Sequence, residues 1–335
     1  METADYQAQM TTFGIRVPDS GPLSSPASIP ERSSLISPSI PYDLPASNVM
    51  VILLTLGAAV GFAVGQICVR VGLKDASPTT AISISIITMT VIVCSILGPF
   101  ILWKELFSTG ALLFMLSGVI TPLVTQVLMY TSATRVGISR ASPLRNTSPL
   151  FASLLAIGFL GERWTLPMAS GTLLIILGAS LLGMRESRGP QTFQRRYLLL
   201  PLAAGFLGGF TSPLRKFAYT LITSVPLATC VALLGSLTTL LIYLSVAGKF
   251  KEVVVNRQTL QWFGMSGISA GIAMTSLLIA LEKGTVVTVS PLIATTPLFT
   301  VLLSFLFLQA FERVTAKIAL GAGSIFLGGA LLIVF

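Results

Sequence analysis

Long apolar runs alternate with short polar segments along the chain. A helix needs about 20 apolar residues to cross roughly 30 Å of hydrocarbon, and several charge-free windows reach that length. These windows are residues 50–69, 76–103, 106–134, 164–184, 217–248, 258–281 and 284–311. Three further stretches qualify less cleanly, because residues 137–161 contain two arginines and residues 197–214 and 318–335 are shorter. The pattern predicts ten transmembrane helices.

The apolar runs are continuous, whereas the strands of a transmembrane barrel alternate in polarity over segments of about ten residues. The sequence therefore predicts an all-α integral membrane protein. Composition agrees, because a chain that is 53% hydrophobic and 10% charged cannot cover a soluble core with a charged surface. The net charge of +9 comes from basic residues at the predicted helix ends, where they meet lipid headgroups. The expected partner is the lipid bilayer and not nucleic acid.

Composition also divides the chain into parts. Residues 1–48 contain seven prolines and nine serines and are predicted to be a disordered tail. Residues 185–196 form a polar linker rich in arginine. The two remaining parts, 49–184 and 197–335, each hold five predicted helices.

The two five-helix parts are related in sequence. Residues 142–151 (SPLRNTSPLF) align with residues 290–299 (SPLIATTPLF) at an offset of 148, and Pro78 and Pro226 share that offset. Because each part holds an odd number of spans, the second copy enters the membrane from the opposite side, which makes the repeats inverted. Inverted repeats in transporters place the substrate site near the midplane and alternate access by rocking. A duplication without transport is the alternative.

These features resemble two EamA-type repeats of the drug/metabolite transporter superfamily, over residues 49–335. The resemblance is carried by the five-plus-five arrangement, by the prolines of the fourth and ninth helices and by the glutamate after each. These residues are Pro143, Pro149, Pro291, Pro297, Glu162 and Glu312. The Trp-Gly pair that is frequent in the first helix of each repeat is missing, and Gly61-Phe62 and Gly205-Phe206 stand nearby.

The resemblance implies a central cavity lined by the first, third, fourth, sixth, eighth and ninth helices, with the fifth and tenth helices peripheral. It also implies a small-molecule metabolite as substrate, often exported.

Positions where one copy is polar and the other is not are candidates for contact with a substrate, because they do not belong to the packing that both copies share. Arg145 and Asn146 replace Ile293 and Ala294 of the second copy. An arginine at a span centre costs roughly 2.5 to 3.5 kcal/mol and normally faces protein or a watery cavity. On a helix Ser142, Arg145 and Asn146 share one face, and Arg145 is predicted to bind a carboxylate or phosphate. Snorkelling or a structural ion pair is the alternative.

Other polar side chains within the predicted spans complete the candidate substrate site: Gln66, Arg70, Gln126, Tyr130, Arg215, Ser290 and Thr295. Anchoring at the interface is the alternative for the cations and for Tyr130. Hydrogen bonds between helices are the alternative for the hydroxyls. Glycine ridges in the first, sixth and eighth helices are predicted to allow close helix packing.

The residues that the chain lacks restrict its chemistry. Histidine is absent, the three cysteines fall inside predicted spans, and every acid outside the tail stands at or near a span end. We therefore expect no catalytic residues, no metal and no cofactor. The expected function is a secondary transporter that exports a small anionic or zwitterionic, amino-acid-like metabolite by alternating access. An exchanger of phosphorylated or nucleotide-like metabolites stays open, as does a scaffold or membrane enzyme.

Basic residues indicate an orientation. They gather in the loops at 185–196 and 249–257, so the positive-inside rule places these loops in the cytoplasm and both termini outside. The cell membrane is the expected location, and a homodimer stays open.

Overall fold

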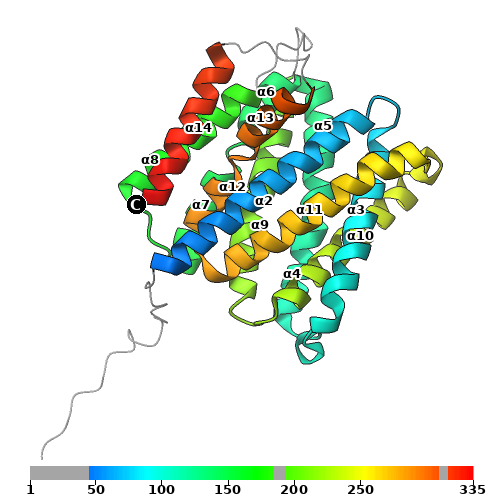
Figure 1. The fold of residues 1–335 in the computed structure, drawn as a ribbon, viewed down its shortest axis with the longest axis horizontal. Coiled ribbons are helices and arrows are strands. Elements are labelled where there is room, and N and C mark those ends of the chain that lie inside the picture. The colour runs from blue at the N-terminus through cyan, green and yellow to red at the C-terminus, as the bar shows by residue number, and fades with distance from the viewer. Residues whose placement is uncertain (1–44, 184–193, 309–315, 335) are drawn as a thin grey trace, which may run out of the picture. The chain divides into compact units, whose positions relative to one another are not determined.

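The computed structural model describes residues 45–183, 194–308 and 316–334. Within these residues every regular element is a helix, as the apolar pattern predicts (Figure 1). The predicted tail and the basic linker lie almost wholly outside the described residues, and Glu312 lies outside them as well.

The first repeat begins with two long helices that end in short turns. Ser77 caps the second helix by accepting a hydrogen bond from the backbone N–H of Thr80 at 3.1 Å, and Pro78 follows it at a position that needs no donor. The third helix is interrupted at Thr121, which is extended at φ −125° and ψ 143° because a residue before proline avoids the helical region. The elements are α2 (Pro45–Gly72), α3 (Pro78–Leu97), η2 (Gly98–Phe100), η3 (Trp103–Glu105), α4 (Thr109–Val119), η4 (Ile120–Val124), α5 (Thr125–Val136), α6 (Ile138–Arg145), α7 (Ser148–Leu160) and α8 (Leu166–Gly183).

The second repeat has the same order with a continuous third helix. Its second helix is again capped by a serine, Ser224, which accepts from the backbone N–H of Leu227 at 3.3 Å. The elements are η5 (Arg195–Leu198), α9 (Leu199–Ala218), α10 (Val225–Val246), η6 (Lys249–Glu252), α11 (Arg257–Lys283), α12 (Val286–Ile293), α13 (Thr296–Leu308) and α14 (Ala316–Val334).

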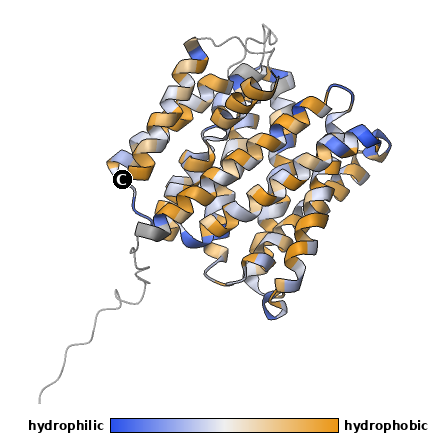
Figure 2. Cartoon of the chain, viewed as in Figure 1, coloured by the Kyte–Doolittle hydropathy of each residue, from blue (hydrophilic) through white to orange (hydrophobic). Residues whose placement is uncertain are grey.

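Nine helices in the described part of the chain are long and apolar enough to cross a membrane. The pair α6 and α7 covers the remaining predicted span, residues 137–161, as two shorter helices. Figure 2 shows apolar residues along the helices and hydrophilic residues gathered towards the helix ends and loops. The ten-helix prediction is therefore confirmed, with the fourth helix broken.

The fourth and ninth helices break at matched positions. Asn146 and Thr147 separate α6 from α7, and Ala294 and Thr295 separate α12 from α13, at the same offset of 148. Prolines on both sides of each break explain it, because a proline inside a helix removes a hydrogen bond and crowds the preceding turn. The fourth and ninth spans are therefore each built from two half-helices.

Helices pack closely where glycines replace side chains. A Cβ atom at Gly205 would lie 2.9 Å from the carbonyl of Leu144, and one at Gly209 would lie 2.5 Å from that of Ser148. The glycine ridge of α9 thus rests on the backbone at the break between α6 and α7. Predicted close packing is confirmed at Gly61, Gly65, Gly205, Gly209, Gly267 and Gly271, whereas Gly57 has no atom within 4 Å.

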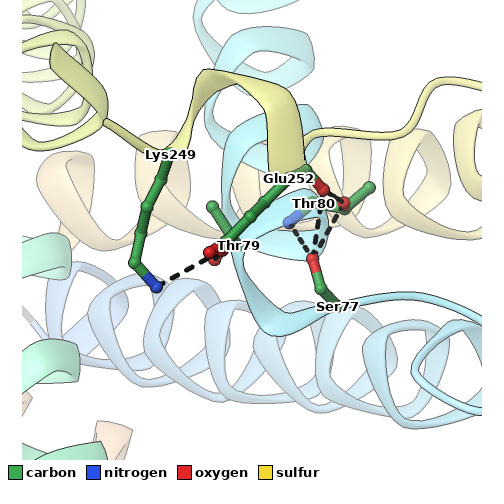
Figure 3. A network of polar contacts seen from close by, with 5 residues as sticks. All are labelled: Ser77, Thr79, Thr80, Lys249 and Glu252. Carbon is green, nitrogen blue, oxygen red and sulfur yellow. Dashed lines mark hydrogen bonds and ion pairs between the residues drawn. The ribbon is translucent and has the colours of Figure 1, made fainter. Parts of the chain in front are cut away.

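We call side A the membrane side where α2 begins at Pro45, and side B the side where it ends at Gly72. On side B, Glu252 links η6 to the start of α3 (Figure 3): its carboxylate accepts from the Thr79 hydroxyl at 2.8 Å and from the Lys249 ammonium at 3.3 Å. On side A, Glu105 links η3 to the start of α10. It accepts from the backbone N–H groups of Thr223 at 3.3 Å and Ser224 at 3.2 Å. The two links are counterparts, as inverted repeats require.

Candidate functional site

Arg215 of α9 is a buried cation inside a membrane helix, with 5% of its surface exposed. Its Nε donates to the Ser117 hydroxyl at 3.0 Å, and its Nη2 donates to the Thr121 hydroxyl at 3.2 Å. Its Nη1 lies 4.0 Å from the Met274 sulfur. The guanidinium therefore joins α9 to the broken third helix and to α11.

The two hydroxyls are oriented towards this role. Ser117 donates its hydrogen to the carbonyl of Phe114 at 2.7 Å, and Thr121 donates its hydrogen to the carbonyl of Ser117 at 3.0 Å. Each oxygen is then left with lone pairs for Arg215. The break at Thr121 places its hydroxyl at the guanidinium, so the local sequence Thr121-Pro122 is part of the site.

The guanidinium lies near the middle of the membrane although the Arg215 backbone is close to a helix end. Ser117 stands eight residues inside the side-A end of its helix, and Met274 stands nine residues inside the side-A end of α11. At 1.5 Å per residue both depths are about 12 to 13 Å, which approaches the midplane of a bilayer roughly 30 Å thick. The long side chain thus carries the charge inward and not to the interface.

Arg215 has no counter-charge in the part of the chain that the structure describes. No carboxylate there lies within ion-pair distance of it. Two neutral oxygens and one distant sulfur satisfy only part of a group that has five N–H donors. A buried cation with so few partners is costly.

Tyr219 lies one helical turn beyond Arg215. Its ring packs edge-on against Phe114 with 4.8 Å between centroids, and its buried hydroxyl has no hydrogen-bond partner among the described residues. Apolar side chains from α4, α7, α9, α11 and α12 surround this pair, including Phe114, Ala152, Ala156, Met274, Val286 and Val289. They form an apolar plug between Arg215 and side A.

The residues predicted around Arg145 lie at the break between α6 and α7. Arg145 is half-buried and interacts with other parts of the chain. Ser142 and Asn146 approach Gly183 of α8, because a Cβ atom there would meet the Ser142 hydroxyl and lie 3.8 Å from the Asn146 amide nitrogen. These two side chains thus face the fifth membrane helix. Their contact with substrate stays a prediction.

The other predicted residues fall into two places. Near side B, Arg70 donates to the Ser304 hydroxyl at 3.0 Å, and the exposed Gln66 accepts from Thr300 at 3.3 Å, so both join α2 to α13. Gln126 is half-buried on α5, and the Tyr130 side chain lies outside what the structure describes.

On the second-repeat side, Ser290 and Thr295 are buried. Thr295 donates to the carbonyl of Leu292 at 2.7 Å, and the Ser290 hydroxyl has no partner among the described residues. Among the predicted residues whose side chains the structure describes, none forms a hydrogen bond with Arg215.

Glu162 is a functional candidate that the sequence marked only as a family feature. Its two carboxylate oxygens accept from the backbone N–H groups of Val286 and Val287, each at 2.9 Å. These are the first two residues of α12, so the carboxylate caps a half-helix whose positive end favours an anion. Lys216 lies nearby and donates to the carbonyls of Leu281 and Glu282. The end of the fourth helix is thereby fixed to the start of the ninth on side A.

Inverted five-helix repeats with matched breaks in the fourth and ninth helices, and a buried cation beside the separate break at Thr121, are the arrangement of a multi-pass membrane transporter. The sequence matches the EamA-like transporter family over residues 49–184 and 195–334, and the chain belongs to that family. A solved structure described as "Crystal structure of protein" has the same fold, with a TM-score of 0.69 at 17% identity. The match covers 84% of this chain and 95% of that one. No curated protein matches the sequence.

Proposed function

We propose that this transporter moves a small anionic or zwitterionic metabolite by alternating access, and that Arg215 binds the negative group. One observation carries the proposal: a guanidinium near the midplane is buried with hydroxyl and sulfur partners and, among the described residues, without a carboxylate. A substrate carboxylate or phosphate would supply the missing charge through paired N–H···O bonds.

The helix breaks support the same substrate class. Each break begins eight residues after its helix starts, which is about 12 Å into the membrane. The half-helices α7 and α13 begin there, and their N-terminal N–H groups favour an anion. Carbonyls at the ends of α6 and α12 favour a cation, so a zwitterion would find both kinds of partner. An amino-acid-like metabolite fits this arrangement.

Alternating access is supported by an asymmetry between the repeats. On side A, α7 packs against α12 and Glu162 joins them. The counterpart pair on side B, α13 and α6, is not closely packed in the described residues. In the mechanism that we propose, this conformation is closed on side A. Interchange with the opposite conformation, which is closed on side B, carries the substrate across the membrane. If the basic side-B loops are cytoplasmic, side A is the outer side, and the export that we propose runs from side B to side A.

A ligand screen on purified full-length protein tests the substrate class. The probes are amino acids, dicarboxylates and sugar phosphates, and the readout is thermal stability in detergent. A true ligand at 100 times its Kd stabilises the protein by about 2.7 kcal/mol. We expect one anionic or zwitterionic class to raise the unfolding temperature, Arg215→Gln to abolish this rise, and Arg215→Lys to retain part of it.

Flux in proteoliposomes separates the two candidate anchors. Arg145→Gln serves as the comparison, because it removes the same charge from a different place, the break between α6 and α7. Lost flux in folded Arg215→Gln with flux retained in Arg145→Gln supports the proposal. Normal flux in folded Arg215→Gln contradicts it, and loss in Arg145→Gln alone would move the anchor to Arg145.

A further inference from the structure

Arg135 and Arg196 lie beside the ring of Tyr197 at the side-B end of the molecule, and Arg195 precedes Arg196 in sequence. Arg135 lies in the last turn of α5, and Arg195, Arg196 and Tyr197 form the start of η5, where the sixth membrane helix enters. We propose that this arginine cluster binds the phosphate of an anionic phospholipid in the side-B leaflet. The site is separate from Arg215, so its test does not depend on the proposed substrate.

One aromatic ring holds two of the cations. The Cζ atom of Arg135 lies 5.4 Å from the centroid of the Tyr197 ring, and that of Arg196 lies 5.2 Å from the same centroid. Both distances are within the range of cation–π attraction. An aromatic face attracts a guanidinium without using up its N–H donors. The ring therefore holds both guanidinium groups beside one side chain and leaves their donors able to bind an anion.

The cluster is not neutralised within the part of the chain that the structure describes. No carboxylate there lies within ion-pair distance of Arg135, Arg195 or Arg196, and all three side chains are exposed. The like charges of Arg135 and Arg196 beside one ring repel one another, and a phosphate is the complement that guanidinium groups bind through paired hydrogen bonds.

The position of the cluster selects a lipid as the source of that phosphate. The arginines stand where two membrane helices meet the interface, at the depth of lipid headgroups. Tyr197 is a residue type enriched at this depth. Leu199 follows it with 65% of its surface exposed, which places an apolar side chain against lipid tails just below the cluster. A headgroup at the arginines and a chain along Leu199 would belong to one molecule.

Retention of lipid by the purified full-length protein tests the proposal. The protein is reconstituted in bilayers of phosphatidylcholine with phosphatidylglycerol, extracted, and examined by native mass spectrometry for bound lipid. Each substitution removes hydrogen bonds between a charged guanidinium and a charged phosphate, which lowers affinity roughly tenfold, so Arg135→Gln with Arg196→Gln is expected to lower the affinity for phosphatidylglycerol about 100-fold. Bound phosphatidylcholine should not change. The matched control is Lys251→Gln with Arg257→Gln, which removes two exposed charges from the same side and should retain the anionic lipid.

Two tyrosine variants distinguish lipid binding at a defined site from diffuse electrostatic attraction. Tyr197→Phe keeps the ring and should retain the lipid, whereas Tyr197→Leu should release it. Equal loss in the arginine pair and the control pair would mean diffuse attraction and would overturn the site. Inorganic phosphate is added to lipid-free protein in a second arm. If it binds as tightly as phosphatidylglycerol and prevents lipid retention, the occupant is a soluble anion and the lipid assignment fails.

Discussion

The Glu162 carboxylate accepts a hydrogen bond from the backbone N–H of Val286 at 2.9 Å, and this bond joins the end of the fourth membrane helix to the start of the ninth. A second bond of equal length comes from Val287. The two helices belong to different repeats, so the contact must break if side A opens. Glu162 is therefore the residue whose removal should shift the proposed alternating-access equilibrium.

Glu162→Ala is expected to increase access from side A. The variant leaves two helix N–H groups without an acceptor, which destabilises the closed arrangement by about 1 to 3 kcal/mol. The reporter is Ala156→Cys in the apolar plug, in a background where Cys68, Cys94 and Cys230 are replaced by alanine. We expect faster modification by an impermeant maleimide applied from side A.

Glu105→Ala is the matched control for this experiment. Glu105 also caps a helix on side A, the start of α10, but it does not join the two broken helices. The control should lower thermal stability without changing the labelling of Ala156→Cys. Equal acceleration in both variants would mean general loosening and would remove Glu162 from the gating role.

The opening of side A should depend on pH through Glu162. Burial raises the pKa of the Glu162 carboxyl above its usual value, although the N–H groups of Val286 and Val287 and the charge of Lys216 act in the opposite direction. A raised pKa in the closed arrangement means that closing takes up a proton. Protonation of Glu162 therefore stabilises the closed arrangement. This stabilisation is fully present below the ordinary pKa of a glutamate carboxyl and is lost as the pH rises through the raised pKa of Glu162.

Labelling of Ala156→Cys from side A should therefore increase with pH beyond the intrinsic reactivity of a thiol. The intrinsic part is measured on Leu166→Cys, which replaces a side chain that is 84% exposed. Glu162→Gln cannot titrate and should leave only the intrinsic dependence. A pH effect that persists in Glu162→Gln would contradict the assignment of the titration to Glu162.

The sequence predicts the helices, because these depend on local properties, and it contains the prolines that explain the breaks seen in the structure. Apolar length sets the spans, and the prolines that recur at an offset of 148 set the breaks. The partners of Arg215 are not local. Its position near a helix end makes interface anchoring an equal alternative, and only the packing of α9 against α4 and α11 turns the side chain inward. The bond from Glu162 to Val286 spans 124 residues, so no spacing rule could predict it.

The hydroxyls beneath Arg215 should matter for stability. Thr121→Val removes the acceptor of the Arg215 Nη2 group and leaves that donor buried without a partner. This should lower the free energy of unfolding by about 1 to 3 kcal/mol. The control is Thr238→Val on α10, an exposed threonine whose hydroxyl bonds only to its own helix, at Leu234. We expect chemical denaturation in detergent to show a clear loss for Thr121→Val and little change for Thr238→Val. Equal losses would mean that Arg215 does not depend on the Thr121 hydroxyl.

The fifth and tenth helices should serve stability and not substrate binding. A Cβ atom at Gly178 of α8 would lie 2.5 Å from the carbonyl of Gly321 on α14, which is backbone and cannot turn aside. Gly178→Ala must push the helices apart and should cost about 1 to 3 kcal/mol. Gly158→Ala is the control, because a Cβ there meets no atom within 4 Å and alanine favours a helix.

Ligand affinity should be unchanged in both variants, since α8 and α14 do not contact Arg215. A Gly178→Ala protein of normal stability would contradict the packing, and weaker ligand binding at normal stability would place α8 in the substrate site.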